Sequence, residues 1–87
     1  MTYSVVWANP ILDRLADLYV GAEPADRERT AAGVEALNRR LATNPTEEGE
    51  SRDGDQRVTF TPCLVVRFRV NLMSDAVRVI GVARSRR

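Results

Sequence analysis

The first part of the chain combines one short apolar run with an amphipathic stripe. Residues 3–7 are β-branched and aromatic and stop before Asn9-Pro10, which predicts a strand. Asn9 and Pro10 predict a helix start, because Asn is a favoured N-cap and Pro is favoured in the first turn. The apolar face of this helix is expected to lie in the core, and Gly21 to end it. That face consists of Ile11, Leu15, Leu18 and Tyr19.

A second stripe predicts a longer helix. Pro24 opens residues 25–42, and Asn44-Pro45 ends the run. Apolar or small side chains recur at helical spacing within it, at Thr30, Val34, Leu37 and Leu41. Two isolated stripes would leave apolar surface in water. Both helices are therefore expected to pack on a sheet formed by the rest of the chain.

The second half of the chain changes to the period of two that is typical of strands. Residues 46–56 are acidic and contain the turn dipeptide Asp53-Gly54, which predicts a loop with a strand beginning near Ser51. Three strands are predicted over 57–61, 64–70 and 76–83. Pro62 and residues 72–75 supply the two connections, and the last strand is apolar enough to be central.

These elements predict one α+β domain over residues 1–87, with the order β-α-α-β-β-β. The sheet is expected to be antiparallel, with two helices packed on one face and the other face partly open. Alternation in the middle strand places Val66, Phe68 and Val70 towards the core. The same alternation places Arg67 and Arg69 on the open face.

Charge is divided unevenly along the chain, although the net charge is only +1. Residues 1–55 carry eleven acids and six arginines, whereas residues 56–87 carry seven arginines and a single acid, Asp75. A localised basic surface favours an anionic partner, either nucleic acid or an acidic protein segment. Exposed strand arginines also keep sheets soluble, so a purely structural interpretation remains open. The candidate binding residues are Arg57, Arg67, Arg69, Arg78, Arg84 and Arg86.

Other chemistries find little support. Cys63 is the only cysteine and there is no histidine, so we expect no disulfide, no metal site and no cofactor. Cys63 follows Pro62 and is expected in a turn. The N-terminus lacks a secretory pattern and no apolar run approaches the ~20 residues of a membrane span, so we expect a cytoplasmic protein without membrane contact.

Taken in order, the segments resemble the RelE/ParE superfamily of toxins from type II toxin–antitoxin systems, a group that includes plasmid stabilisation proteins. The resemblance covers the whole chain and rests on element order more than on fixed residues. The segments that carry it are YSVVW, NPILDRLADLYV, the second helix ending LATNP, the Gly-Glu-Ser-Arg loop, RVTFTPCLVVRFRV and AVRVIGVARSRR. It implies a growth-inhibiting toxin that an antitoxin neutralises by wrapping around it.

For the RelE-like branch, the resemblance implies cleavage of mRNA in the ribosome by basic residues of the sheet. The key third-strand arginine of that branch aligns with Val65, and no tyrosine follows the terminal arginines. An RNA-cleaving member would therefore hold the scissile phosphate with other residues, namely Arg67, Arg69, Arg84 and Arg86. The ParE-like branch implies DNA gyrase as the target and needs no catalytic set, and the Asp- and Leu-rich first helix favours it slightly.

Three functions stay open, in this order: a ParE-like toxin that binds gyrase, a RelE-like ribosome-dependent mRNA endonuclease, and an inactive homologue that acts only as a binding module. Whether the chain is an enzyme is left open by this order. The expected partners are a cognate antitoxin and either gyrase or the ribosome with mRNA. A homodimer and a toxin–antitoxin hetero-oligomer both fit. An acidic amphipathic antitoxin segment is expected over the sheet or in the groove beside the helices.

Overall fold

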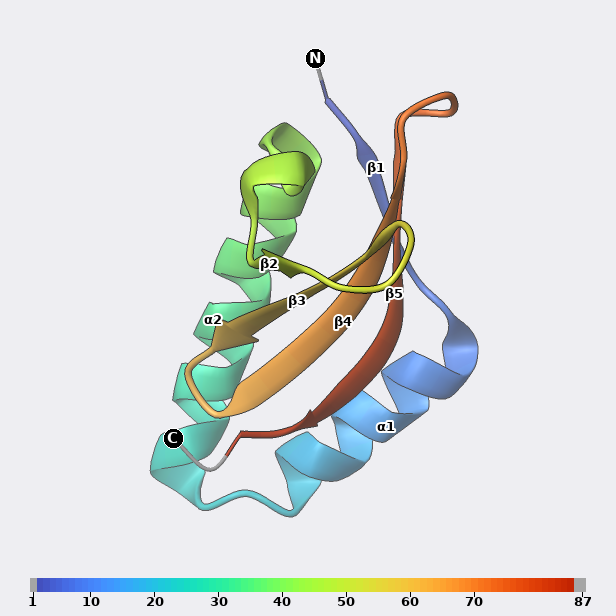
Figure 1. Cartoon of the computed structure of the whole chain (residues 1–87). Helices are drawn as coiled ribbons and strands as arrows, with labels where there is room; N and C mark the ends of the chain where they lie inside the picture. The colour runs from blue at the N-terminus through green and yellow to red at the C-terminus, as the bar shows by residue number, and fades with distance from the viewer. Residues whose placement is uncertain (1, 86–87) are drawn as a thin grey trace.

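A five-stranded sheet and two helices make up the fold in the computed structural model, which describes residues 2–85 (Figure 1). Their bounds agree with the predicted elements to within about two residues. The strand predicted near Ser51 is the two-residue β2, and the short turn η1 is an addition. The elements are β1 (Ser4–Trp7), α1 (Asn9–Val20), α2 (Pro24–Thr43), the 3₁₀ turn η1 (Pro45–Glu47), β2 (Glu50–Ser51), β3 (Gln56–Thr61), β4 (Leu64–Asn71) and β5 (Ala76–Arg84).

The strands lie in the order β1-β5-β4-β3-β2, which confirms the central place predicted for the last strand. The strands β2 to β5 form an antiparallel meander, but β1 pairs with β5 in parallel, with Ser4 opposite Ala76. The sheet is therefore mixed rather than wholly antiparallel as expected. Parallel pairing needs a long crossover between strands, and α1 and α2 provide one, because they carry the chain from the end of β1 to the opposite end of the sheet.

A proline lies in the first turn of each helix, and Gly21 follows the end of α1, as the sequence predicts. The helix α1 is capped by Ala8, and Asn9 is its first residue, so the expected capping role of Asn9 is wrong. At its other end, the Gly21 amide donates to the Asp17 carbonyl at 3.0 Å. Between residues 2 and 85, no helix is long and apolar enough to cross a membrane.

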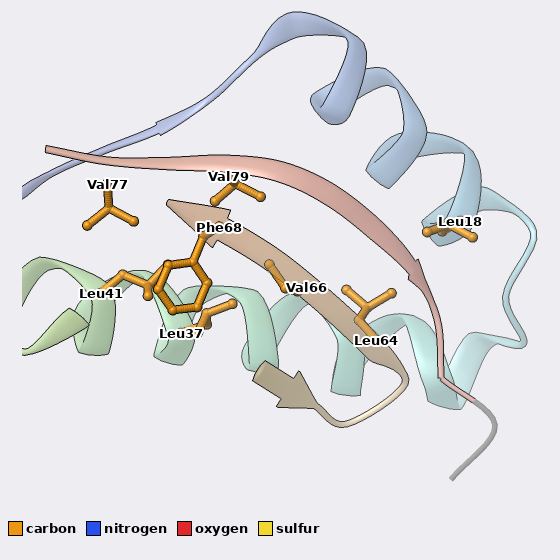
Figure 2. Close-up of a cluster of buried hydrophobic side chains, with 8 residues drawn as sticks. All are labelled: Leu18, Leu37, Leu41, Leu64, Val66, Phe68, Val77 and Val79. Carbon is orange, nitrogen blue, oxygen red and sulfur yellow. The ribbon is translucent and has the colours of Figure 1, made fainter. Parts of the chain in front are cut away.

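The core lies between the helices and one face of the sheet. Phe68 is fully buried at its centre, and Figure 2 shows its ring directed towards Leu37 and Leu41 of α2. The helix α1 contributes Leu18 to the same cluster. Tyr19, expected in the core, is instead 42% exposed, because the stripe of α1 is wider than the part that touches the sheet. The remaining buried members are Leu64, Val66, Val77 and Val79.

The turn between β3 and β4 has a left-handed residue. Pro62 precedes Cys63, whose φ is 77°, the arrangement of a type II turn with proline at its second position. The Cys63 carbonyl accepts a hydrogen bond from the Ser85 amide at 2.9 Å, which ties the end of β5 to this turn. The expectation that Cys63 is a turn residue is thus confirmed.

The strand β3 turns its polar side chains towards the helices. Thr59 pairs with buried Val66, and its hydroxyl donates to the Glu48 carboxylate at 2.6 Å. Arg40 of α2 donates to the same carboxylate through Nε at 2.9 Å and through a second nitrogen at 3.2 Å. Burial by itself would raise the pKa of Glu48, but these hydrogen bonds and the charges of Arg40 and Arg57 lower it below its ordinary value.

Gly49 lets this carboxylate segment approach β3 closely. Its φ is +67°, and a Cβ at this position would lie 2.2 Å from the Val58 carbonyl oxygen and 2.8 Å from the Thr59 Cβ. Both neighbours belong to a strand in the middle of the ladder and cannot withdraw. Glycine is therefore required here for space as well as for conformation.

We expect Gly49→Ala to lower the free energy of unfolding by more than about 2 kcal/mol, because steric overlap adds to the cost of a positive φ. Gly54→Ala is the matched control, since Gly54 has a φ of +64° but nothing within 4 Å of an added Cβ. That control should lose only about 1 kcal/mol. Urea unfolding of the two variants measures the difference, and equal losses would show that the close approach is absent in solution.

We expect stability to fall in acid in a way that depends on Glu48. Its lowered pKa means that the ionised form stabilises the fold above the ordinary value of 4.5, and that this stabilisation is lost as the pH falls through the lower folded value. Glu48→Gln should flatten the acid side of the stability curve, whereas Glu50→Gln at an exposed position should not. Thermal unfolding between pH 7 and pH 3 tests this, and parallel curves for both variants would contradict it.

Candidate basic face of the sheet

The open face of the sheet carries a row of arginines from β4 and β5. Arg67 and Arg69 are exposed, while Phe68 between them is buried. Arg69 is paired with Arg78 across the β4–β5 ladder, and residues paired in this way point to the same side of a sheet. Arg67, Arg69 and Arg78 therefore form one surface, called here the open-face row.

Few acidic side chains lie near the positive charges of this row. Arg69 Nε lies 3.6 Å from Asp55 Oδ1, and half of the Arg69 side chain remains exposed. Arg67 and Arg78 make no ion pair and no side-chain hydrogen bond with any residue from 2 to 85. Neighbouring cations repel one another unless an anion lies between them. The row is thus suited to an anionic ligand.

Arg52 extends the basic surface beside Arg67, a placement that sequence reasoning missed. The two arginines and Gln56 line a hollow of about 420 Å³ on the β2–β3 side of the sheet. Arg52 is partly neutralised by Glu50, with 3.2 Å between its guanidinium and the carboxylate. The signal was the Asp53-Gly54 turn, since a hairpin at that point returns the preceding residues to the sheet.

Arg57 lies on the opposite face from the row, although it was expected to join it. It pairs with the buried Phe68 and so points towards the helix layer. Its guanidinium donates to the carbonyl of Glu48 at 2.8 Å and to that of Gly49 at 3.1 Å. These bonds hold the segment before β2 against β3. Arg57 is therefore placed to stabilise the fold, not to bind an external ligand.

Arg84 is also separated from the row, and a bulge in β5 is the cause. Arg67 pairs with Gly81 but Phe68 pairs with Val79, so Ile80 is an extra residue in β5. The extra residue reverses the alternation beyond it. Arg84 consequently pairs with buried Leu64 and points to the helix side.

On the helix side, Arg84 approaches Gly21 and lines a hollow of about 160 Å³ together with Arg29 and Cys63. Of the three arginines of the expected phosphate clamp that the structure describes, Arg67 and Arg69 share the open face and Arg84 does not. Arg86, the fourth, lies outside the described residues.

In chemical terms, the open-face row can bind a phosphate and stabilise negative charge that develops on it. The sequence has no histidine, and residues 2–85 contain no cluster of three Cys, Asp or Glu side chains that could hold a metal ion.

A second surface lies between the helices. An apolar groove of about 480 Å³ runs between α1 and α2, lined mainly by aliphatic and aromatic side chains. Leu12 and Tyr19 are 45% and 42% exposed on its α1 side, and Val20 is 68% exposed. Contiguous exposed apolar surface of this kind is characteristic of a protein-binding site.

The sequence matches no protein-family model and no curated protein. Similarity is found in solved structures instead. The toxin–antitoxin complex RelBE2 from Mycobacterium tuberculosis contains a chain with a TM-score of 0.73 and 16% identity, covering 98% of this chain and 100% of that one. A double arginine-to-alanine mutant of the E. coli toxin RelE in the free state gives 0.71 and 16%, covering 99% and 86%.

The archaeal RelE-RelB complex from Pyrococcus horikoshii OT3 is a third similar structure, with a TM-score of 0.64 and 17% identity over 100% of this chain and 99% of that one. All three likenesses extend over essentially the whole length of the chain, including the helical pair and the meander. This chain therefore has the α+β fold of the RelE toxins.

Proposed function

We propose that this chain is a growth-inhibiting toxin that cleaves mRNA in the RelE-like manner, with the open-face row as its RNA-binding surface. The observation that carries the proposal is the row itself, three arginines on the exposed face of a RelE fold, two of them without a counter-ion among residues 2–85. An RNA backbone supplies the anions that such a row lacks.

This proposal reverses the order of functions favoured by the sequence alone. The solved structures with this fold are named as RelE toxins and RelBE complexes, and none of the three is a ParE protein. A gyrase-directed toxin therefore has no support from them. One of the similar structures is a RelE in which two arginines two residues apart are replaced by alanine. Both Arg67 with Arg69 and Arg84 with Arg86 have the same spacing here.

The contribution of the row to cleavage would be electrostatic. When the 2′-hydroxyl of a ribose loses its proton to water and attacks the adjacent phosphate, the bond to the 5′-oxygen of the next nucleotide breaks, and that oxygen takes up a proton from water. Negative charge accumulates on the phosphate oxygens during this exchange, and guanidinium groups placed around them stabilise it. Arg67 and Arg69 provide two such groups at a fixed spacing on one strand, and Arg78 provides a third beside Arg69.

We infer an antitoxin as the partner that occupies the groove between α1 and α2. Two of the similar structures are toxin–antitoxin complexes, and the groove exposes apolar side chains of α1 and α2. An amphipathic helix laid in the groove would cover Leu12, Tyr19 and Val20 with its own apolar face. The open-face row is left for an acidic part of the same partner.

Induced expression of the full chain in bacteria should stop growth and generate new mRNA ends. Arg67→Ala with Arg69→Ala should reduce those ends by roughly 10²-fold, the order expected when groups that stabilise the reacting charge are removed. Arg14→Ala with Arg39→Ala changes the net charge equally, on exposed helix positions, and should leave both arrest and ends intact.

Sequencing of mRNA 5′ ends in the arrested cells is the measurement, with thermal unfolding to show that each variant is folded. Arrest with intact mRNA would overturn RNA cleavage in favour of another target. Unimpaired growth with folded protein would identify an inactive homologue.

Leu12→Glu should weaken neutralisation by an antitoxin, because it places a charge in the apolar groove while remaining compatible with the first half of α1. Ala32→Glu, on an exposed position of α2 outside the groove lining, is its matched control. The readout is rescue of growth by the product of any adjacent gene that encodes a small acidic protein, titrated by its inducer. Equal rescue of both variants would place the antitoxin elsewhere.

A further inference from the structure

Beside Arg67, the open face has a bare area of sheet that forms a hollow of about 380 Å³. Arg67 is flanked by Val58 on β3 and by Gly81 on β5, and Val65 is flanked on β5 by Ala83. Because Gly81 has no side chain and Ala83 only a methyl group, the β5 backbone is uncovered there. The bulge at Ile80 is what turns these two small residues to the open face.

The fold does not require this area to be bare. A Cβ added at Gly81 would meet only the Arg67 Cβ, at 3.7 Å, which is an ordinary contact. Gly81 also has no positive φ, unlike Gly49 and Gly54. A larger residue could therefore occupy this strand position without strain. The hollow is a property of the surface and not a by-product of packing in the core.

The lining of the hollow combines an apolar floor with two polar groups at one edge. Val58, Val65 and Ile80 contribute to the floor, while Gln56 and Arg67 stand at the edge. The side-chain amide of Gln56 makes no hydrogen bond within residues 2–85, and the Arg67 guanidinium has no counter-ion there. Both polar groups are thus available to a ligand.

These groups match one nucleotide of a single-stranded RNA. A nucleobase is flat and can cover the apolar floor, its edge offers donors and acceptors to an amide, and its phosphate offers a charge to a guanidinium. The volume falls within the range of roughly 300–1,000 Å³ that is typical of small-ligand sites. Among the described residues that line the hollow itself, Arg67 is the one cation, and the apolar floor offers nothing to the carboxylates of an acidic peptide.

We propose that the hollow is a nucleobase subsite, an inference that rests on the proposed function. The nucleotide next to the phosphate held by Arg67 places its base over Gly81 and Ala83, and Gln56 bonds the edge of that base. Because an amide presents both a donor and an acceptor, it distinguishes between bases. The cleaver would therefore show a base preference at one fixed position relative to the cut.

The test compares three variants in the assay that maps mRNA 5′ ends after induction. Gly81→Val fills the hollow and suits a strand, and it should reduce cleavage about tenfold, the order expected for loss of one base contact. Gln56→Ala should keep most of the cleavage but relax the base preference at one position. Ala76→Val, on the same face of β5 outside the hollow, is the control and should change neither.

The outcomes separate this subsite from the function on which it rests. New mRNA ends with unchanged number and base preference in both Gly81→Val and Gln56→Ala would overturn the subsite and leave an RNA cleaver that reads only the backbone. Absence of new ends with the unaltered chain would overturn the proposed function and the subsite with it. Thermal unfolding must show that all variants are folded.

Discussion

The pairing of β4 with β5 is the contact on which both the core and the candidate site depend. On one side it places Phe68 opposite Val79 inside the core, and on the other it places Arg69 beside Arg78. A single extra residue, Ile80, determines which side chains of β5 point to the open face and which point to the helices. Had β5 been regular, Arg84 would lie on the open face and Gly81 would face the helices. The bulge therefore fixes the composition of the basic face.

The arginines of the basic half serve two different purposes, although they look alike in the sequence. Arg57 uses its guanidinium within the fold, where two carbonyl groups accept its hydrogen bonds. Arg67 and Arg78 leave theirs exposed, without a partner among residues 2–85. The planar guanidinium suits both purposes, because it can satisfy fixed carbonyls or bind a phosphate. Net charge alone does not distinguish the two.

Local pattern was sufficient for most of the fold. The helices and the inward face of β4 could be predicted from the spacing of apolar residues within each segment. The burial of Leu37, Leu41 and Phe68 confirms those predictions. The polar inward face of β3 could not be predicted, since it depends on Glu48 and Arg40 from other segments. The bulge could not be predicted either, because Ile80-Gly81 continues an apolar run that is typical of a regular strand. For the same reason Arg84 lies on the other side of the sheet from Arg67 and Arg69.

The parallel pairing of β1 with β5 joins two strands that are far apart in the sequence, since the paired residues Ser4 and Ala76 are separated by 72 positions. A chain growing on the ribosome cannot close this sheet, or bring Arg69 beside Arg78, until β5 has been synthesised. Contacts of such long range form late and slow folding. This topology delays the appearance of the basic face until β5 has been added, after both helices and the β3–β4 hairpin.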